Sequence, residues 1–328
     1  MTRREAWWLA VVVALTLVGA GCGSGDEPAA PAPRTIAFLR AVVSNQPENQ
    51  NAFLDALQDE GYIEGDNLTI LAKAPDEVHT EAADAEQAVR AWQAAGADLV
   101  IALSTGSAKA AAAAAPGLDV LFLVNDPVAS GLVTDERRPG GRLTGVTFRV
   151  PADRTLDLIR RTFAGIAAVG VLFSPDDPAS QAVRDQAVRA AAGLGVTVLE
   201  AAFGDESGAV AAVQDVRSRG AGAVWLLNSP TAFRFAGAVE SAATAASLPV
   251  VTNTARPAAL LTLQPDAVEL YRQLASQVAR VLGGTPIAEV PVENPSRFVV
   301  DVNLRAAAQL GITVPDEVQS QAGVRITR

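Results

Sequence analysis

Cysteine and histidine are almost missing from this chain: Cys22 and His79 are single residues among 328. One cysteine cannot form a disulfide within the chain, so packing must stabilise the fold. One histidine and one cysteine are too few for a His/Cys metal site. A histidine that acts as a base also needs partners within hydrogen-bond reach, and we interpret His79 as a solvated residue at a helix start. We expect no metal and no cofactor.

Sequence motifs of enzyme chemistry are missing as well. The chain has no Gly-x-Ser-x-Gly elbow, no P-loop and no dinucleotide-binding glycine motif. The neighbouring carboxylates Asp176 and Asp177 precede a helical pattern, where a carboxylate caps backbone N–H groups. We therefore predict that the protein is not an enzyme, with a hydrolase or transferase as the weaker alternative.

Positive charge is scarce, with 26 Lys and Arg against 36 Asp and Glu and a net charge of −10. Such a chain lacks the basic surface that nucleic acids and anionic lipids attract. After the N-terminal apolar segment, no run reaches the roughly 18 apolar residues that span a bilayer. We expect no nucleic-acid partner, and the length suits two domains of ordinary size.

Cys22 directly follows a secretory-type N-terminus. Two arginines precede an uncharged apolar segment, and small residues then lead to the cysteine. This order is typical of a lipoprotein signal, whose cysteine is acylated and becomes the mature N-terminus. We predict a signal peptide over 1–21, lipidation of Cys22 and a flexible tether over 22–34 that is rich in Gly, Ser, Pro and Ala. A buried thiol is the alternative. The predicted location is the outer face of the cell membrane.

From residue 35 onward, short β-rich runs alternate with amphipathic helical segments. The predicted strands are 35–39, 67–71, 98–102, 120–124, 169–173, 196–199, 223–227, 249–252, 258–263 and 298–302. The predicted helices are 49–60, 81–95, 107–115, 152–163, 179–192 (ended by Gly193), 209–219, 231–246, 268–282 and 304–310. Apolar strands separated by such helices predict an α/β fold with parallel sheets. Two consecutive series predict two similar lobes.

Ligands of open parallel sheets bind beyond the carboxyl ends of the strands, next to helix N-termini. After the strand 98–102, hydroxyl residues and a glycine open a helix whose free N–H groups suit a carboxylate. An ordinary N-cap is the simpler alternative. Small polar residues follow other strands too. The candidate ligand-binding residues are Ser44, Asn45, Ser104, Thr105, Gly106, Ser107, Asn125, Asp126, Ser174, Asn228, Ser229 and Thr254. Four aromatic residues are expected either to form walls of the ligand site or to belong to the core: Phe38, Phe148, Phe173 and Trp225.

Several segments, taken in order, resemble one protein family. They are 60–67, 125–133, 138–146, 169–173, 291–295 and 303–312. These are similar to ABC-importer substrate-binding lipoproteins, a family that includes tryptophan- and phenylalanine-binding proteins. The resemblance implies a type I periplasmic-binding fold, with two Rossmann-like lobes, a three-strand hinge and a ligand between the lobes. It also implies lobe boundaries: residues 35–146 plus 256–286 for the first lobe, and 147–255 plus 287–328 for the second.

The resemblance also implies roles for single residues. A Gly-Thr-Pro loop of the family falls on 104–106, which implies a carboxylate cradle there, and its Asp-Pro falls on Asp126. Ser229 and Thr254 stand where family members often carry aspartate. If those aspartates pair with a ligand ammonium, their loss weakens the case for an amino acid, because a buried ammonium without a countercharge is costly.

These features together predict an extracytoplasmic solute-binding protein of an ABC importer. It would close on a small polar ligand, an amino acid or a related carboxylate, by hinge rotation. The alternative is a receptor that signals to a membrane protein without transport. The expected partners are the small-molecule ligand, an ABC permease and ATPase complex, and the membrane through the lipid on Cys22. The expected state is a monomer.

Overall fold

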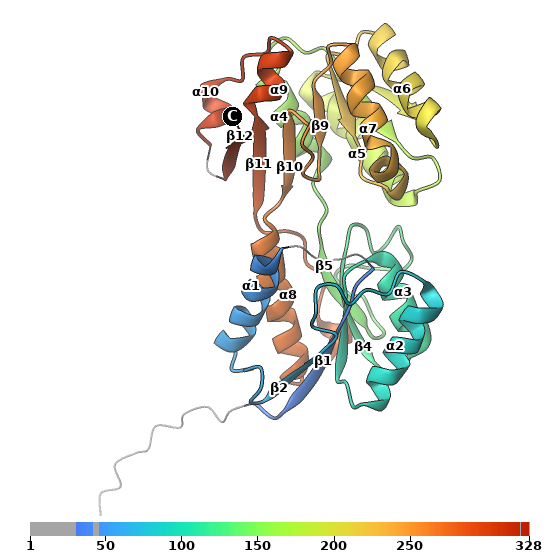
Figure 1. Cartoon of the computed structure of the whole chain (residues 1–328), viewed down its shortest axis with the longest axis vertical. Helices are drawn as coiled ribbons and strands as arrows, with labels where there is room; N and C mark the ends of the chain where they lie inside the picture. The colour runs from blue at the N-terminus through green and yellow to red at the C-terminus, as the bar shows by residue number, and fades with distance from the viewer. Residues whose placement is uncertain (1–30, 42–45, 322, 328) are drawn as a thin grey trace, which may run out of the picture. The chain divides into compact units, whose positions relative to one another are not determined.

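The computed structural model describes residues 31–41, 46–321 and 323–327, and its α/β chain builds two sheets (Figure 1). The first sheet has five parallel strands in the order β2-β1-β3-β4-β5. Its strands are β1 (Arg34–Leu39), β2 (Leu68–Leu71), β3 (Leu99–Ala102), β4 (Asp119–Val124) and β5 (Leu143–Thr147). Its helices are α1 (Pro47–Asp59), α2 (Ala82–Ala94), α3 (Thr105–Ala114) and α8 (Ala267–Leu282), with the 3-10 turn η1 (Ile287–Glu289).

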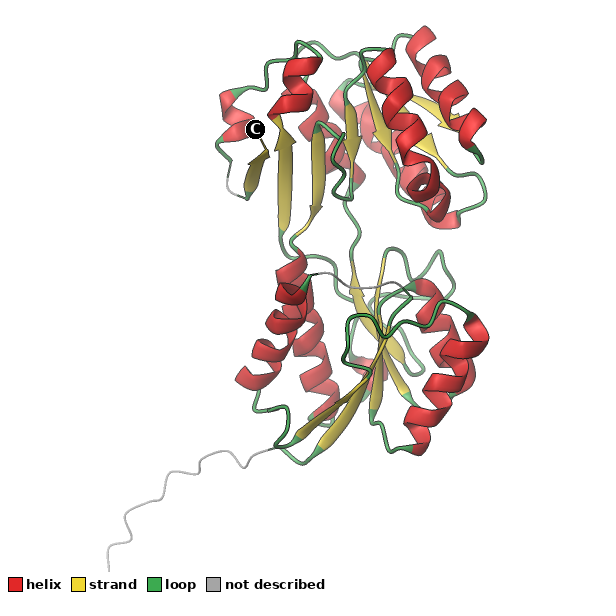
Figure 2. Ribbon diagram, viewed as in Figure 1, coloured by secondary structure: helices red, strands yellow, loops and turns green. Residues whose placement is uncertain are grey.

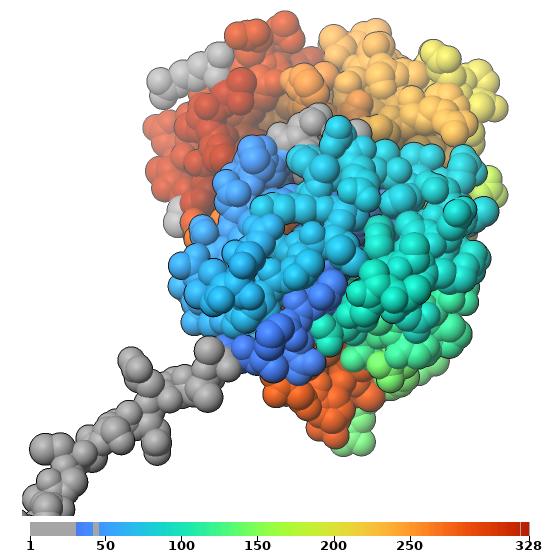
Figure 3. Space-filling model, turned by 60° about the horizontal axis from the view of Figure 1, so that its bottom comes forward, coloured from blue at the N-terminus to red at the C-terminus, as the bar shows by residue number. Residues whose placement is uncertain are grey.

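Two helix pairs cover the faces of this sheet. Apolar residues of α1 and α8 pack on one face, around Phe38 and Phe53, whose rings meet edge-on at 5.2 Å between centroids. Alanine-rich faces of α2 and α3 pack on the other. The helix α8 comes late in the chain, and in Figure 3 its orange region borders the blue and cyan atoms of the N-terminal half.

The second sheet has seven strands in the order β12-β11-β10-β9-β8-β6-β7. They are β6 (Ala168–Phe173), β7 (Thr197–Ala202), β8 (Ala223–Leu226), β9 (Val250–Thr252), β10 (Leu261–Pro265), β11 (Phe298–Asn303) and β12 (Val324–Thr327). The helices beside it are α4 (Ala152–Thr162), α5 (Pro178–Leu194), α6 (Glu206–Ser218), α7 (Pro230–Ala245), α9 (Leu304–Gln309) and α10 (Asp316–Gln319). Residues of α4, α5, α9 and α10 pack on one face, and those of α6 and α7 on the other (Figure 2).

The predicted two-lobe α/β fold is confirmed, with one refinement in the second sheet. Its β10 and β11 pair antiparallel, so this sheet is mixed rather than wholly parallel. The chain passes between the sheets three times: after β5, after β10 and before β11. Residues of both lobes lie beside these three connections.

Sheet pairing differs from the predicted lobe boundaries. The strand β10, expected in the first lobe, pairs with β9 and β11 in the second sheet. Residues after α8 stay with the first lobe to about residue 294, since Thr144 Oγ1 donates to the carbonyl of Val290 (2.7 Å) and Thr147 N–H to that of Glu293 (2.8 Å). Periodicity identifies a strand but not the sheet that it joins.

Several local predictions also differ from the structure. The strand β5 was not predicted, and neither were α10 and β12. The helix α5 continues through Gly193 and ends at Gly195, whose φ of 67° is the left-handed conformation of a helix cap. Arg34, placed in the predicted tether, begins β1. The predicted signal peptide, Cys22 and the tether to residue 30 lie outside the described residues. Within the described ranges, no helix has the length and apolar character needed to cross a membrane.

Candidate functional site

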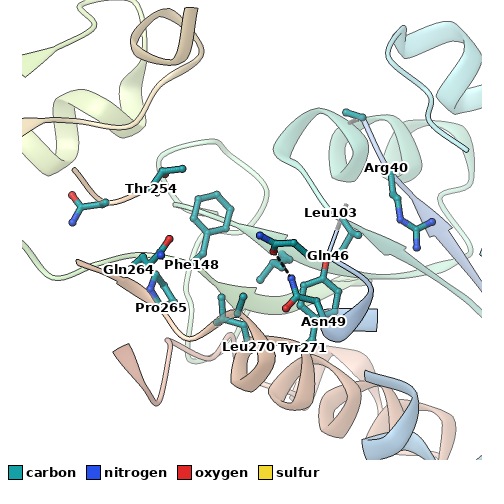
Figure 4. A pocket seen from close by; sticks show the side chains of 14 residues that line it. Arg40, Gln46, Asn49, Leu103, Phe148, Thr254, Gln264, Pro265, Leu270 and Tyr271 are labelled. Atoms are coloured by element: carbon teal, nitrogen blue, oxygen red, sulfur yellow. Dashed lines mark hydrogen bonds between the residues drawn. The ribbon is translucent and has the colours of Figure 1, made fainter. Parts of the chain in front are cut away.

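A cavity of about 500 Å³ lies beside the connections between the sheets, and residues of both lobes line it (Figure 4). The first lobe contributes residues that follow β1 and β3, residues of β4 and the stretch after β5, and the first turns of α1 and α8. The second lobe contributes residues after β9 and at the end of β10. The lining residues are Arg40, Ala41, Gln46, Asn49, Leu103, Leu123, Phe148, Asn253, Thr254, Gln264, Pro265, Ala267, Leu270 and Tyr271.

Arg40 follows β1 directly and is only 3% exposed. Its Nη1 donates to the carbonyl of Ala72 (2.6 Å) and its Nη2 to Oε1 of Gln50 (3.2 Å). The guanidinium carbon lies 4.5 Å from the ring centroid of Phe38. The buried Nε has no partner among the described residues. Burial lowers the pKa of Arg40, so a positive charge is held in a costly environment.

The N-terminus of α1 borders the cavity through Gln46 and Asn49. Asn49 is 6% exposed, and its Nδ2 donates to Oε1 of Gln46 (2.7 Å). Gln46 is the N-cap residue, and its carbonyl accepts from the N–H of Asn49 (3.2 Å), but its side chain does not cap a backbone N–H of the first turn. Because unpaired N–H groups carry the positive end of the helix dipole, this N-terminus favours an anion.

The helix α8 brings Leu270 and Tyr271 to the same cavity. Burial raises the pKa of Tyr271, and the charge of Arg40 acts in the opposite direction, so the hydroxyl is neutral near pH 7. The N-terminus of α8 is already satisfied, because Oδ1 of Asp266 accepts from the N–H of Glu269 (3.3 Å). The two helices thus present different N-termini: a carboxylate caps α8, whereas the cap residue of α1 is a neutral glutamine.

Hydrogen bonds fix the polar lining of the second lobe. Asn253 accepts from Nε1 of Trp225 (2.8 Å) and donates to Oγ1 of Thr155 (3.1 Å) and to the carbonyl of Leu263 (2.9 Å). Gln264 Nε2 donates to Oδ2 of Asp301 (2.6 Å). Thr254 is exposed at this rim. Most of this lining is therefore held before any ligand arrives.

Apolar side chains complete the walls. Of the four aromatic residues predicted as walls or core, Phe148 lines the cavity. Phe38 and Trp225 are fully buried. The ring of Phe38 packs against the guanidinium of Arg40, and Trp225 donates a hydrogen bond to Asn253. Phe173 is a core residue with the guanidinium of Arg184 4.7 Å from its ring centroid. The cavity thus combines an apolar wall with a few placed polar groups, as small-molecule sites do.

The predicted cradle at the start of α3 has the geometry of an N-cap. Ser107 N–H donates to Oγ of Ser104 (3.0 Å), and that hydroxyl donates to Oγ of Ser107 (2.8 Å). Thr105 is partly exposed and Gly106 exposed. None of these four residues lines the cavity described above. Ligand binding by this N-terminus stays a prediction.

Asp126 lies after β4 in a network of its own. Its Oδ1 accepts from the N–H of Ala129 (2.9 Å) and lies 3.4 Å from Nη2 of Arg149, which also contacts Glu136 (2.5 Å). This carboxylate is therefore paired within the first lobe. The neighbouring Asn125 is partly buried, and neither residue lines the cavity.

The predicted residues of the second lobe follow three neighbouring parallel strands, β6, β8 and β9, and make separate hydrogen bonds there. Ser229 caps α7, accepting from the N–H of Ala232 (2.9 Å), and the partly buried Asn228 precedes it. The buried Ser174 donates its N–H to Oγ of Ser180 (3.2 Å). Of the predicted residues that the structure describes, Thr254 alone is in the cavity lining. Ser44 and Asn45 lie outside the described residues.

Sequence reasoning did not select six polar lining residues: Arg40, Gln46, Asn49, Asn253, Gln264 and Tyr271. One signal was available for two of them. An arginine directly after a buried strand and an asparagine on the apolar face of α1 both place polar atoms where the chain otherwise buries carbon. Gln264 and Tyr271 carry no such signal, because only the fold brings residues 220 positions apart to one cavity.

Solved structures share this fold. A protein of Streptococcus pneumonia in complex with L-Trp superposes with a TM-score of 0.72 at 23% identity, covering 90% of this chain and 100% of that one. A ligand-free, open substrate binding protein with adhesive properties from Clostridium difficile gives a TM-score of 0.76 at 20% identity, covering 90% and 99%. A conserved domain protein of Vibrio cholerae gives 0.71 at 24% identity, covering 90% and 100%.

Two sequence comparisons concern the family. A tyrosine-binding protein of Clostridioides difficile is 32% identical over 130 residues, which are 39% of this chain and 36% of that protein. The match thus spans little more than a third of that relative. The family model for the ABC transporter substrate binding protein matches residues 43–326, which include every strand except β1 and the last residue of β12, and every lining residue of the cavity except Arg40 and Ala41. This chain belongs to the ABC transporter substrate binding protein family.

Proposed function

We propose that this protein is the solute receptor of an ABC importer and holds a small ligand, an amino acid or a related carboxylate, in the cavity of Figure 4. The observation that carries the proposal is that both lobes line one cavity beside the three connecting segments. A ligand that contacts both lobes favours their closed arrangement by the difference in its affinity for the two states. The relatives named for tryptophan and tyrosine support the ligand class.

The receptor would pass its ligand to a permease and ATPase complex in the membrane. We propose that a lipid on Cys22 anchors it outside the cytoplasmic membrane, and that residues 23–30, rich in Gly, Pro and Ala, give it reach. A labelled fatty acid, fed to cells and recovered on the wild type but not on Cys22→Ala, would test the anchor. Label on the Cys22→Ala protein would contradict it.

Ligand binding itself is tested with the purified full-length protein in mild detergent. A thermal-shift screen over amino acids, purines and small organic acids should find ligands that raise the melting temperature, because binding to the folded state stabilises it. Calorimetry should then give one ligand per chain. A screen in which no compound raises the melting temperature would contradict the proposed function.

Transport is tested separately from binding. Uptake of the identified ligand, in radiolabelled form, should fall in a strain that lacks this protein and return when the gene is restored. Normal uptake by the deletion strain would favour the alternative, a receptor that reports its occupied state to a membrane signalling protein.

A further inference from the structure

The cavity carries positive charge without negative charge. Arg40 is the charged residue among the fourteen that line it, and within the described part of the chain no Asp or Glu joins the lining. The four residues 42–45, between Ala41 and Gln46 in the chain, are Val-Val-Ser-Asn and contain no acid. Gln46, Asn49, Asn253 and Gln264 are neutral amides.

The charge of Arg40 is incompletely compensated. Its two hydrogen bonds go to neutral oxygens, a carbonyl and an amide, and its Nε has no partner among the described residues. Glu77, the acid whose charge acts on it, is exposed. A buried cation without a paired anion is expensive. An anionic ligand group would relieve that cost.

The N-terminus of α1 adds a second anion-favouring feature beside Arg40. Its cap residue, the neutral Gln46, accepts from Asn49 through its carbonyl (3.2 Å) and its Oε1 (2.7 Å), and its Glu48 is exposed. The N-terminus of α8 differs because Asp266 caps it with a carboxylate; each helix has one glutamate in its first turn, Glu48 in α1 and Glu269 in α8. The helix dipole of α1 and the guanidinium therefore act together on the same end of the cavity.

Among the described residues that line the cavity, no acid is present to pair with an ammonium group. Asp126, the sequence candidate, is bound by the N–H of Ala129 and by Arg149. Asp301, which lies behind Gln264, is held by two hydrogen bonds from Arg325 (2.6 and 3.0 Å). An ammonium group in this cavity would lose its hydration without gaining a countercharge, and it would also be repelled by the charge of Arg40. Both effects weaken binding.

We propose that the cavity selects a monocarboxylate that lacks a free ammonium group, with its carboxylate at Arg40 and the N-terminus of α1. The class is that of aromatic or branched acids in which a hydroxyl, an oxo group or an acylated amine replaces the amine. Phe148, Leu103 and Leu270 contact the apolar body, and the neutral amides contact the replacing group. The inference rests on the proposed function, since it takes this cavity as the ligand site.

Two matched sets of ligands test this selectivity by calorimetry on the full-length protein. One set is phenyllactate, phenylalanine and phenethylamine; the other is 2-hydroxy-4-methylpentanoate, leucine and 3-methylbutylamine. Each hydroxy acid should bind about tenfold tighter than its amino acid, or more, and neither amine should bind. An amino acid that binds as tightly as its hydroxy acid would overturn the inference, as would hydroxy acids that do not bind. Failure of the proposed function looks different, because the broad thermal-shift screen would then find no ligand.

Substitutions of Arg40 test whether the carboxylate of the ligand binds at this residue. Arg40→Gln should weaken hydroxy-acid binding by about tenfold or more, and Arg40→Lys should keep the preference over the amino acid. Arg184→Gln is a matched control, because Arg184 also lies over a phenylalanine ring but is outside the cavity lining. Phenyllactamide, the neutral amide of phenyllactate, should bind Arg40→Gln and wild type alike, which separates lost charge from lost folding. Wild-type affinity of Arg40→Gln for phenyllactate would overturn the assignment.

Discussion

Nε1 of Trp225 donates a 2.8 Å hydrogen bond to Oδ1 of Asn253, and this bond joins the core of the second lobe to the cavity lining. Trp225 is fully buried in β8, and Asn253 follows β9, the next strand in the sheet. The two amide hydrogens of Asn253 reach α4 and β10. A single core side chain thus fixes a residue that the ligand is proposed to meet.

Trp225→Phe should therefore reduce both stability and ligand affinity. It removes the donor to a buried amide oxygen, which costs about 1–3 kcal/mol, and leaves a space that the smaller ring does not fill. Urea denaturation measures the first effect and calorimetry the second. Trp92→Phe is the control, because Trp92 meets the ring of His79 edge-on and lies outside the cavity lining. Equal losses of affinity in both variants would contradict a positioning role for Trp225.

Gly145 in β5 is the position where a methyl group should do most damage. A Cβ there would lie 2.0 Å from the carbonyl oxygen of Phe122 in the paired strand β4. Gly145→Ala should therefore cost about 3 kcal/mol or more, since the strand must move. Gly193→Ala is its opposite: the site is open and helical, so it should stabilise by about 0.5–1 kcal/mol. Denaturant unfolding midpoints, compared at an unchanged slope, measure the change in the free energy of unfolding for both variants. A Gly145→Ala variant as stable as wild type would contradict the close approach of β4 and β5.

The same glycine shows why part of the fold escaped sequence reasoning. The order of helices and strands follows from apolar periodicity, and most predicted segments match within two or three residues. The strand β5 is short and contains Gly145, a residue that propensity counts against a strand. The strand β10 was recognised, but its sheet was not, because membership depends on pairing with β9 and β11.

The cavity was harder to predict than the fold. Three residues that directly follow strands, Arg40, Leu103 and Asn253, line the cavity, in keeping with the rule that ligands bind beyond strand ends. Hydroxyl residues were favoured there, and the structure uses several of them as helix caps, as Ser104 and Ser229 show. Local sequence cannot tell a capping hydroxyl from a ligand-binding one, because both need the same N–H groups.

Thr105→Val compares the two helix N-termini that suit a carboxylate. With the ligand carboxylate at Arg40 and α1, this variant should change affinity less than about twofold, because Thr105 lies outside the cavity lining. Calorimetry with phenyllactate measures it. A loss of about 1 kcal/mol or more, the cost of an orphaned buried partner, would place the carboxylate at α3 instead, as the sequence predicted.

Asp205 and Asp177 cap helices but should respond to pH with opposite sign. The N–H of Gly208 and the hydroxyl of Ser207 lower the pKa of Asp205, so its stabilising effect is present above the unfolded-state pKa and is lost as pH falls through the lowered value. Burial raises the pKa of Asp177, so its ionised form is penalised near neutral pH and relieved as pH falls through the raised value.

Denaturation of two variants between about pH 3 and pH 7 tests these signs. Asp205→Asn should be less stable than wild type at pH 7, with the difference vanishing in acid. Asp177→Asn should be as stable as wild type or more stable at pH 7, since asparagine also caps a helix without carrying the penalised charge. Parallel pH profiles for the two variants would contradict the assignment.

Thr254→Asp should shift the ligand preference toward amino acids. Thr254 is exposed at the cavity rim, so a carboxylate is tolerated there and supplies the countercharge that the lining lacks. An ammonium then gains a partner, while a hydroxy acid meets added negative charge. The affinity ratio of phenyllactate to phenylalanine should fall by about tenfold, equivalent to about 1.4 kcal/mol. Thr244→Asp, on an exposed site of α7 outside the lining, should leave the ratio unchanged. If both variants keep the wild-type ratio, the absence of acid does not set the selectivity of this cavity.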